Sequence, residues 1–300
     1  MKERTIYALG FFDGVHLGHQ ALLKACRELA ECHGCKAGAV TFTTHPDSLV
    51  SGKTPALLTT NEDKRRLLRY YAMDTVVELP FDKQLMATLW TAFLEQLLEE
   101  GAAGFVCGDD FRFGAKGSGT AEKLAAFCKE KGLPYAIVPE QLLDGQRISS
   151  TRIRSVLEQG DMEQAKRLLG HPLILTGTVL AGKQLGRTMD IPTANLSLPE
   201  SLVTPKFGVY ACKVWAEGKE YLAVTNIGTR PTVEGEGITV EAHLLDFDGD
   251  LYGKEITVAF YDFLRPEQKF ADLDALKTQI AADIAKVKGF PRGEAVSEAD

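Results

Sequence analysis

The hydrophobic rhythm of the chain changes once, after Pro172, and this change constrains the fold more than any other feature. Before it, short apolar runs alternate with helical patterns, as in βαβ units: residues 5–9, 38–42, 75–79, 104–107 and 135–138. After it, apolar runs follow one another across glycine-containing turns: residues 171–179, 209–215, 221–226, 239–246 and 255–263. The sequence predicts a Rossmann-like α/β domain with a parallel sheet, followed by an antiparallel β-barrel or sandwich.

Helical patterns complete this outline. Helices are predicted from Gly18 to about Ala30, over residues 150–158 and 162–169, and at the end over residues 272–288. An apolar stripe from Leu85 to Leu98 indicates one more helix, whose aromatic side chains face the core. The predicted domains are residues 1–170 and 171–290, and residues 291–300 form a frayed tail.

Charge and cysteine content narrow the class of protein. The 300 residues carry 41 acidic and 34 basic side chains, a net charge of −7, which argues against a general nucleic-acid surface. No apolar run is long enough for a membrane span or a signal peptide, so the six cysteines indicate reduced thiols and a cytoplasmic protein. Cys32 and Cys35 have the spacing of a zinc pair, but no second pair completes a tetrahedral site.

The first candidate site follows the first predicted strand. The segment Gly10-Phe11-Phe12-Asp13-Gly14-Val15-His16-Leu17-Gly18-His19 turns on glycines and enters a helix close to Gly18. Glycines admit a phosphate close to the backbone, a helix N-terminus is positive, and two imidazoles three residues apart can reach one oxyanion. The alternative reading is a tight turn with two histidines at a helix start.

A second candidate anion site follows the last strand of the same predicted sheet. Arg147-Ile148-Ser149-Ser150-Thr151-Arg152-Ile153-Arg154 puts hydroxyls at an N-cap and arginines in the first turn, although an ordinary cap explains the segment alone. Two such sites at the ends of sheet strands are typical of ligand binding by open α/β sheets.

With these motifs and Gly108-Asp109-Asp110-Phe111, the first half resembles the HxGH nucleotidyltransferases. It is similar in particular to the N-terminal module of bacterial bifunctional riboflavin kinase/FMN adenylyltransferases, or FAD synthetases. The resemblance implies an ATP site that comprises Gly10, Phe11, Asp13, Gly14, His16, His19, Ser149, Ser150, Thr151 and Arg154. It also implies that Gly108, Asp110 and Phe111 lie near the flavin phosphate, with His16 and His19 as catalytic residues. The family usually has an acidic residue and a proline where this chain has Thr43 and Thr44, which makes adenylylation the less certain activity.

The second half contains a further constellation. Gly182, Lys183, Gly186, Arg187 and Thr188 form a loop that can close over phosphates. In Pro192-Thr193-Ala194-Asn195, an extended backbone would place a hydroxyl and an amide oxygen on one face, as a hard cation requires. A polar turn explains the same residues equally well when they are taken alone.

These segments are followed by others at residues 208–211, 226–232, 241–247, 249–253 and 265–270, in the order found in riboflavin kinase domains. The resemblance therefore covers nearly the whole chain. It implies that the loop binds ATP, that Thr193 and Asn195 hold Mg2+ and the ATP phosphates, and that Glu241 is the general base. His243, two residues further on, is interpreted as structural. Met189-Asp190-Ile191 stands where the family commonly has a glycine followed by an aromatic residue, and Asp190 replaces a residue with free backbone, which affects the expected loop geometry.

The resulting hypothesis is an enzyme that phosphorylates riboflavin to FMN and then adenylylates FMN to FAD, with ATP as co-substrate and Mg2+. Three alternatives stay open: a riboflavin kinase with weak adenylyltransferase activity, a non-catalytic flavin or nucleotide sensor, and an RNA-binding regulator. The net charge of −7 disfavours the last. The expected partners are the small molecules riboflavin, FMN and ATP, with no nucleic acid and no membrane, and the oligomeric state is left open.

Overall fold

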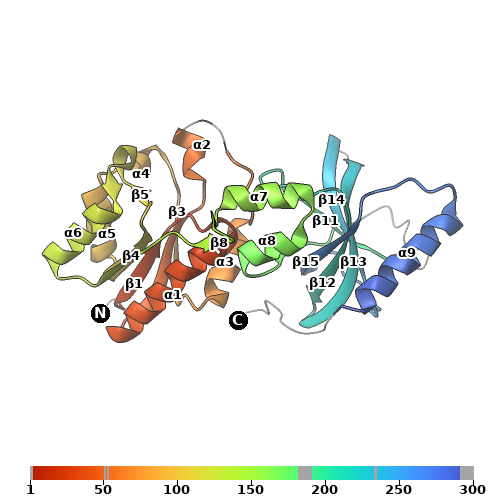
Figure 1. The fold of residues 1–300 in the computed structure, drawn as a ribbon, viewed down its shortest axis with the longest axis horizontal. Helices are drawn as coiled ribbons and strands as arrows, with labels where there is room; N and C mark the ends of the chain where they lie inside the picture. Colours follow the sequence, from red (N-terminus) through yellow and green to blue (C-terminus); the bar gives the residue numbers. More distant parts are fainter. Residues whose placement is uncertain (1–2, 51, 53, 182–190, 233–234, 291–300) are drawn as a thin grey trace. The chain divides into compact units, whose positions relative to one another are not determined.

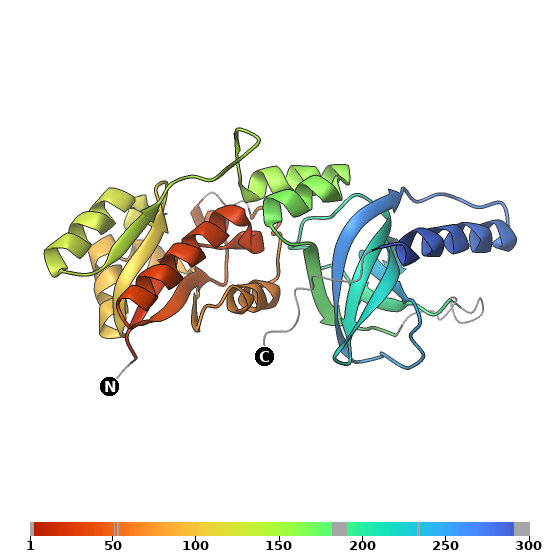
Figure 2. The same ribbon diagram turned by 60° about the horizontal axis from the view of Figure 1, so that its bottom comes forward.

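The structure is a computed structural model that describes residues 3–50, 52, 54–181, 191–232 and 235–290. It divides into two compact units (Figures 1 and 2). Among the described residues, the first comprises those up to Pro55 and Lys64–Ser150, and the second comprises Ala56–Asp63 and residues 151–290. The predicted loop at residues 182–190, which includes Asp190, and the tail at residues 291–300 lie outside the described residues.

The elements up to residue 147 include all the strands of the parallel sheet. In chain order they are β1 (Thr5–Leu9), η1 (Asp13–Val15), α1 (Leu17–Cys32), β2 (Lys36–Phe42), α2 (Pro46–Val50), α3 (Asn61–Tyr70), β3 (Thr75–Leu79), α4 (Lys83–Ala87), α5 (Trp90–Glu99), β4 (Ala102–Gly108), β5 (Arg112–Phe113), η2 (Ala115–Gly117), β6 (Gly119–Thr120), α6 (Ala121–Lys131), β7 (Tyr135–Val138), β8 (Leu142–Leu143) and β9 (Gln146–Arg147).

The parallel sheet has the strand order β3-β2-β1-β4-β7. Alternate residues of β1 face opposite sides: Tyr7 and Leu9 pack with α5 and α6, whereas Cys26 of α1 donates its thiol to the carbonyl oxygen of Ile6. The chain leaves β1 on one side to form β2 and β3 and on the other to form β4. The sheet therefore has its topological switch point between β1 and β4, where open α/β sheets bind ligands.

The helix predicted from Gly18 to about Ala30 spans Leu17–Cys32, so His16 precedes it. Another helix prediction was wrong. The stripe from Leu85 to Leu98 forms two helices, α4 and α5, because Thr88 is extended and its carbonyl oxygen accepts a hydrogen bond from Ala115 N at 2.7 Å.

The remaining elements are α7 (Ser150–Gln159), α8 (Met162–Leu169), β10 (Leu173–Thr178), β11 (Ala194–Ser197), β12 (Gly208–Ala216), β13 (Lys219–Thr232), β14 (Gly235–Leu244), β15 (Glu255–Arg265) and α9 (Leu273–Lys288). All neighbouring strands pair antiparallel in the order β10-β15-β12-β13-β14-β11. Leu180, which follows β10, donates its backbone N–H to Asn195 of β11 at 2.8 Å. This bond nearly closes the six strands into the predicted barrel.

Helix α9 packs on β12 and β13 through Val287 and the buried apolar side chains of those strands. Figure 2 shows it as a separate helix that follows the last strand. Its second attachment is polar: Asp283, whose side chain is 1% exposed, accepts a hydrogen bond from Arg265 Nε at 2.9 Å. Gln279 donates to the other carboxylate oxygen, so the buried charge is satisfied by two side chains.

All six cysteines are free thiols, and four of them (Cys26, Cys107, Cys128 and Cys212) are buried. Burial raises the pKa of Cys26 and Cys128 to about 11. The described residues contain no group of three or more metal-ligating side chains, so Cys32 and Cys35 have no further zinc ligands in this part of the chain. No helix in the described ranges is long and apolar enough to cross a membrane.

Candidate active sites

The loop after β1 is held in a strained conformation. Phe12 and Val15 have positive φ angles of 58° and 39°, which non-glycine residues rarely adopt, and Gly14 has a φ of 75°. The Thr41 hydroxyl fixes the loop by donating to the carbonyl oxygen of Phe11 at 2.8 Å. Such strain costs of order 1–3 kcal/mol per residue and is concentrated at functional sites. The backbone N–H of Gly10 donates to Val40 O, so this donor is used within the sheet.

The geometry of the HxGH motif explains its spacing. His16 is the N-cap of α1, and its Nδ1 accepts a hydrogen bond from the backbone N–H of His19 at 3.4 Å. The two imidazole rings stack with their centres 3.7 Å apart and an angle of 15° between their planes. A Cβ on Gly18 would lie 3.1 Å from the His16 ring, so a glycine between the histidines leaves room for the ring.

His19 is a neutral side chain with an unused polar atom. Burial lowers its pKa well below the ordinary value, and the nearby charges of His16 and Lys64 lower it further. Its Nδ1 is buried and has no hydrogen-bond partner among the described residues. A buried polar atom without a partner is costly, and a bound ligand would satisfy it.

The second predicted anion segment begins α7. The Ser150 hydroxyl donates to the carbonyl oxygen of Asp13 at 3.1 Å, so it contacts the loop after β1 directly. Thr151 and Arg154 lie in the first turn of α7, where Arg154 Nη1 donates to the Thr151 hydroxyl at 3.4 Å. Ser149 lies immediately before the helix. The N-terminal N–H groups of α7 and the Arg154 guanidinium are donors suited to a phosphate.

The loop after β4 contains the predicted flavin-phosphate residues. Asp110 forms an ion pair with Arg147, whose Nε also lies 2.8 Å from Glu140 Oε1. The Phe111 ring stacks on Phe113 with 5.3 Å between the ring centres. Gly108 ends β4, next to the end of β1 in the sheet, so both predicted loops lie at the switch point.

A large apolar cavity lies in the same unit. It has a volume of about 950 Å³ and is lined by aromatic, aliphatic and two basic side chains: Phe42, Pro46, Leu49, Val50, Phe81, Leu85, Met86, Ala87, Phe93, Arg112, Phe113 and Lys116, with Gly114, Ala115 and Gly117. The sequence analysis treats the stripe that contains Leu85, Met86 and Phe93 as core. Phe93 is indeed in the core, but all three also face this cavity. An apolar cavity with a few polar groups is typical of a small-molecule site.

Glu241 and Asn195, which are predicted to act in riboflavin phosphorylation, lie in a row with Asn226 across three strands of the barrel. Glu241 of β14 lies directly opposite Asn195 of β11 on one side and Asn226 of β13 on the other. Directly opposed residues share a face of the sheet, so one carboxylate lies between two amides. Asn226 Nδ2 donates to Glu267 Oε1 at 3.1 Å, and a Cβ on Gly228 would lie only 2.1 Å from that oxygen.

His243 anchors the Pro192-Thr193 segment to this row. Its Nδ1 lies 2.8 Å from the carbonyl oxygen of Pro192, which only accepts, so the proton is on Nδ1. Asn195 Nδ2 donates to the carbonyl oxygen of Thr193 at 3.2 Å. A cavity of about 60 Å³ adjoins both residues and is also lined by Asp250. The structure therefore brings Thr193, Asn195 and Glu241 to one region of the barrel.

Two features of this unit, the apolar cavity and a buried lysine, have no signal in the sequence. The apolar cavity is formed by residues far apart in the chain, so no local pattern indicates it. Lys64 lies in α3, which is itself not predicted because only Lys64, Asp63, Leu67 and Leu68 of its ten residues are buried. A lysine in such a polar segment is expected to be exposed to solvent.

Comparison with known proteins finds a family model for each half of the chain. The family model described as FAD synthetase matches residues 1–152, and the one described as riboflavin kinase matches residues 169–290. A bifunctional riboflavin kinase/FMN adenylyltransferase from Escherichia coli (strain K12) is 39% identical, in an alignment that covers 96% of this chain and 93% of that protein. The protein of the same name from Listeria monocytogenes is 35% identical over 95% of this chain and 92% of its own length.

A solved structure titled as a macrolide-efflux protein from Streptococcus pneumoniae has the same fold, with a TM-score of 0.85 and 29% identity over 97% of this chain and 96% of that one. Relatives with both domains and both activities do not favour the sensor, the RNA-binding regulator or the weakened adenylyltransferase. The chain belongs to the bifunctional riboflavin kinase/FMN adenylyltransferases, and it converts riboflavin to FMN and FMN to FAD with ATP as co-substrate.

Proposed function

We propose that the two reactions use two separate sites, one built on the loops after β1 and β4 and one on the barrel row around Glu241. In the first, the loop after β1 with His16, His19, Ser149, Ser150, Thr151 and Arg154 binds the ATP triphosphate. The unpartnered Nδ1 of His19 is the observation that carries this assignment, because it marks where a ligand atom completes the site. The assignment of the second site rests on the strand register, which places Glu241 between Asn195 and Asn226.

The apolar cavity suits the isoalloxazine ring of FMN. Its aromatic lining offers stacking surfaces for a flat ring system, and Arg112 and Lys116 supply positive charge for the phosphate. Gly108, Asp110 and Phe111 shape the loop beside it, and the Arg147 guanidinium neutralises the Asp110 carboxylate, which would otherwise repel the phosphate.

In the adenylylation, an oxygen of the FMN phosphate attacks the α-phosphorus of ATP. The bond from that phosphorus to the α,β-bridging oxygen breaks, and pyrophosphate leaves. Because a phosphate monoester is largely ionised at neutral pH, no general base is needed. His16, His19, the α1 and α7 N-termini and Arg154 hold the reacting groups in position and offset the negative charge.

In the phosphorylation, the 5′-hydroxyl of the riboflavin ribityl chain is neutral and must lose a proton as it attacks the γ-phosphorus. Glu241 accepts that proton, the bond between the γ-phosphorus and the β,γ-bridging oxygen breaks, and ADP leaves. Gly182, Lys183, Gly186, Arg187 and Thr188, which lie outside the described residues, are proposed to bind the ATP phosphates.

The Thr193 hydroxyl and the Asn195 amide are hard oxygen donors that fit Mg2+ held jointly with ATP phosphates. They are too few for a site made by protein alone, in keeping with the absence of larger ligand clusters from the described ranges. When bound, Mg2+ would offset charge on the transferring phosphoryl group. We place both reactions in the cytosol because both use ATP and all six cysteines are free thiols.

The assignment is tested by two variants assayed for both activities. His19→Ala is expected to lower FAD formation from FMN by about 100-fold and to leave FMN formation from riboflavin unchanged. Glu241→Gln is expected to abolish FMN formation while FMN supplied in the medium is still converted to FAD. Loss of both activities to the same degree in either variant would show that the two-site assignment is wrong.

A further inference from the structure

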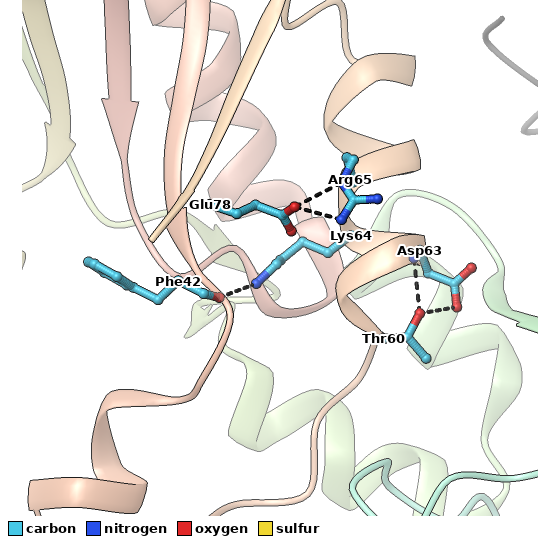
Figure 3. A network of polar contacts seen from close by, with 6 residues as sticks. All are labelled: Phe42, Thr60, Asp63, Lys64, Arg65 and Glu78. Atoms are coloured by element: carbon cyan, nitrogen blue, oxygen red, sulfur yellow. Dashed lines mark hydrogen bonds and ion pairs between the residues drawn. The ribbon is translucent and has the colours of Figure 1, made fainter. Parts of the chain in front are cut away.

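Lys64 is a buried charge for which neither the fold nor the reaction described above has a use. It lies in the first turn of α3 and its side chain is almost completely buried. Figure 3 shows the side chain leaving α3 and ending at the carbonyl oxygen of Phe42, to which its ammonium donates at 2.7 Å. An apolar side chain of similar length would fill this space without the cost of removing a charge from water.

No carboxylate pairs with Lys64 in the described part of the chain. The nearest acidic residue of the sheet, Glu78, is engaged by Arg65, whose Nε and Nη2 donate to Glu78 Oε2 at 2.8 and 2.6 Å (Figure 3). The ammonium has three N–H donors, and its contacts are the Phe42 carbonyl and the face of the Phe11 ring, 4.4 Å from the ring centre. Its positive charge is thus available to an anion that is not part of the protein.

The two contacts locate this charge between the two substrate regions of the unit. Phe11 belongs to the strained loop after β1, and its ring also meets His45 edge-on with 4.5 Å between the centres. Phe42 ends β2, the neighbour of β1, and lines the apolar cavity. Lys64 therefore contacts the loop after β1 through the Phe11 ring, and its bond to Phe42 O joins it to the backbone of a residue that lines the apolar cavity.

We propose that Lys64 is a positioning residue for FMN adenylylation, which holds the Phe11 loop against the end of β2 and supplies the buried positive charge that the ATP and FMN phosphates meet there. The inference rests on the proposed location of both substrates. It explains why α3 buries a lysine without a counter-ion, because the counter-ion is the substrate.

The groups around Lys64 make its charge dependent on pH. Burial lowers its pKa to about 8, Arg65 lowers it as well, and the Glu78 and Asp13 carboxylates act in the opposite direction. His19, on α1, is close enough for the Lys64 charge to lower its pKa. In the free enzyme Lys64 is charged below pH 8 and loses its charge above it, so adenylylation is expected to weaken there.

The test uses the full chain and compares three substitutions in α3, with both activities measured on each protein. Lys64→Met removes the charge, Lys64→Arg keeps a charge that does not titrate near pH 8, and Arg69→Met is the control, since it removes an exposed cation from the same helix. We expect Lys64→Met to lower kcat/KM for FMN adenylylation about 10- to 100-fold. Neither the rate of riboflavin phosphorylation nor the Tm should fall. Arg69→Met leaves both activities unchanged.

The pH profile separates this role from a purely structural one. In the wild-type chain, kcat/KM for adenylylation falls above pH 8, whereas in Lys64→Arg it stays level up to about pH 9.5. The inference is overturned if Lys64→Met keeps the wild-type kcat/KM, if both activities fall together, or if Lys64→Arg has the wild-type profile. A wild-type chain that forms no FAD from FMN would instead refute the proposed function.

Discussion

At the scale of single residues, the adenylyltransferase site depends on close packing around His16. A Cβ on Gly18 would approach the His16 ring to 3.1 Å, and that ring is fixed by its bond to His19 N and by stacking on His19. Gly18→Ala is therefore expected to displace the imidazole by a few tenths of an ångström.

We expect this displacement to lower kcat for FAD formation about tenfold, because small misplacements of positioning groups strongly affect rates. Steady-state assays of both reactions on the purified variant check this, and riboflavin phosphorylation serves as the control within the same chain. Wild-type adenylylation in Gly18→Ala would mean that the His16 ring is not held as described.

A second residue-scale prediction concerns His243, which the sequence analysis interprets as structural. Its Nδ1–H bond to Pro192 O positions the segment that presents Thr193. His243→Phe keeps the ring but removes the donor, so we expect the KM for ATP in riboflavin phosphorylation to rise about threefold to tenfold, as loss of about 1 kcal/mol implies. FMN adenylylation should be unaffected, and an unchanged KM would contradict a positioning role.

Lys64 also has a predicted effect on stability. A pKa lowered from 10.5 to about 8 corresponds to about 3 kcal/mol of destabilisation while the lysine is charged. The unfolded chain holds this proton up to pH 10.5 and the folded chain only up to about pH 8. The cost is therefore complete below pH 8 and decreases as the pH rises toward 10.5.

Lys64→Met should accordingly be more stable than the wild-type chain at pH 7, by at most about 3 kcal/mol, with a smaller difference at pH 9.5. Urea unfolding of both proteins at the two pH values measures this difference in stability. A difference that does not change with pH would contradict the assignment of a charged, buried Lys64.

At the scale of secondary-structure elements, the strands were the predictable part. The strands β1, β3 and β7 and the helix α8 have the predicted bounds, because each combines a clear apolar pattern with glycine, proline or polar residues at its ends. Helix α3 was not predictable, since its apolar residues are few and its contacts are with distant parts of the chain. The break between α4 and α5 depends on a bond from Ala115, which no local pattern reveals.

The same distinction applies to the sites. His16, His19, Thr193, Asn195 and Glu241 stand in motifs that can be recognised along the sequence. The flavin cavity, Lys64 and the row from Asn195 to Asn226 arise only when strands and helices distant in sequence pack together. Motifs thus indicated which chemistry to expect, and tertiary packing brings together the further side chains that we propose take part.

An element-scale prediction concerns the attachment of α9. Replacing Asp283 with Ala would leave the guanidinium of Arg265, whose side chain is 15% exposed, without its counter-ion. We expect a loss of about 3 kcal/mol in the free energy of unfolding, because breaking a buried pair leaves an uncompensated charge.

The control is Glu217→Ala, which breaks an ion pair with Lys254 in which both side chains are 47% exposed and should cost less than about 1 kcal/mol. Chemical unfolding, monitored by the loss of riboflavin phosphorylation, measures the stability of both variants. Equal losses in the two variants would contradict the structural role given to the Arg265–Asp283 pair.

At the scale of the whole molecule, the chain consists of two compact units, each with its own sheet and its own set of candidate catalytic residues. The parallel sheet offers loops and helix N-termini whose donors are suited to phosphates, as a reaction requires whose nucleophile is already ionised. The barrel offers a carboxylate held between two amides, which suits a reaction whose nucleophile must lose a proton.

This division also fixes the order of the products. Riboflavin has no phosphate until the barrel site has acted, so FMN must appear before FAD when riboflavin is the only flavin supplied. Each reaction can serve as the internal control for substitutions in the other site.

The central claim is that two sites act separately. It is tested most directly by mixing two variants that each lack one of the two activities. His19→Ala and Glu241→Gln are each incubated with riboflavin, ATP and Mg2+, alone and together in equal amounts, and the flavins are separated by chromatography. We predict that His19→Ala alone stops at FMN, that Glu241→Gln alone leaves riboflavin unchanged, and that the mixture forms FAD. A mixture that forms no FAD, or a single variant that forms FAD from riboflavin as fast as the wild type, would contradict the account.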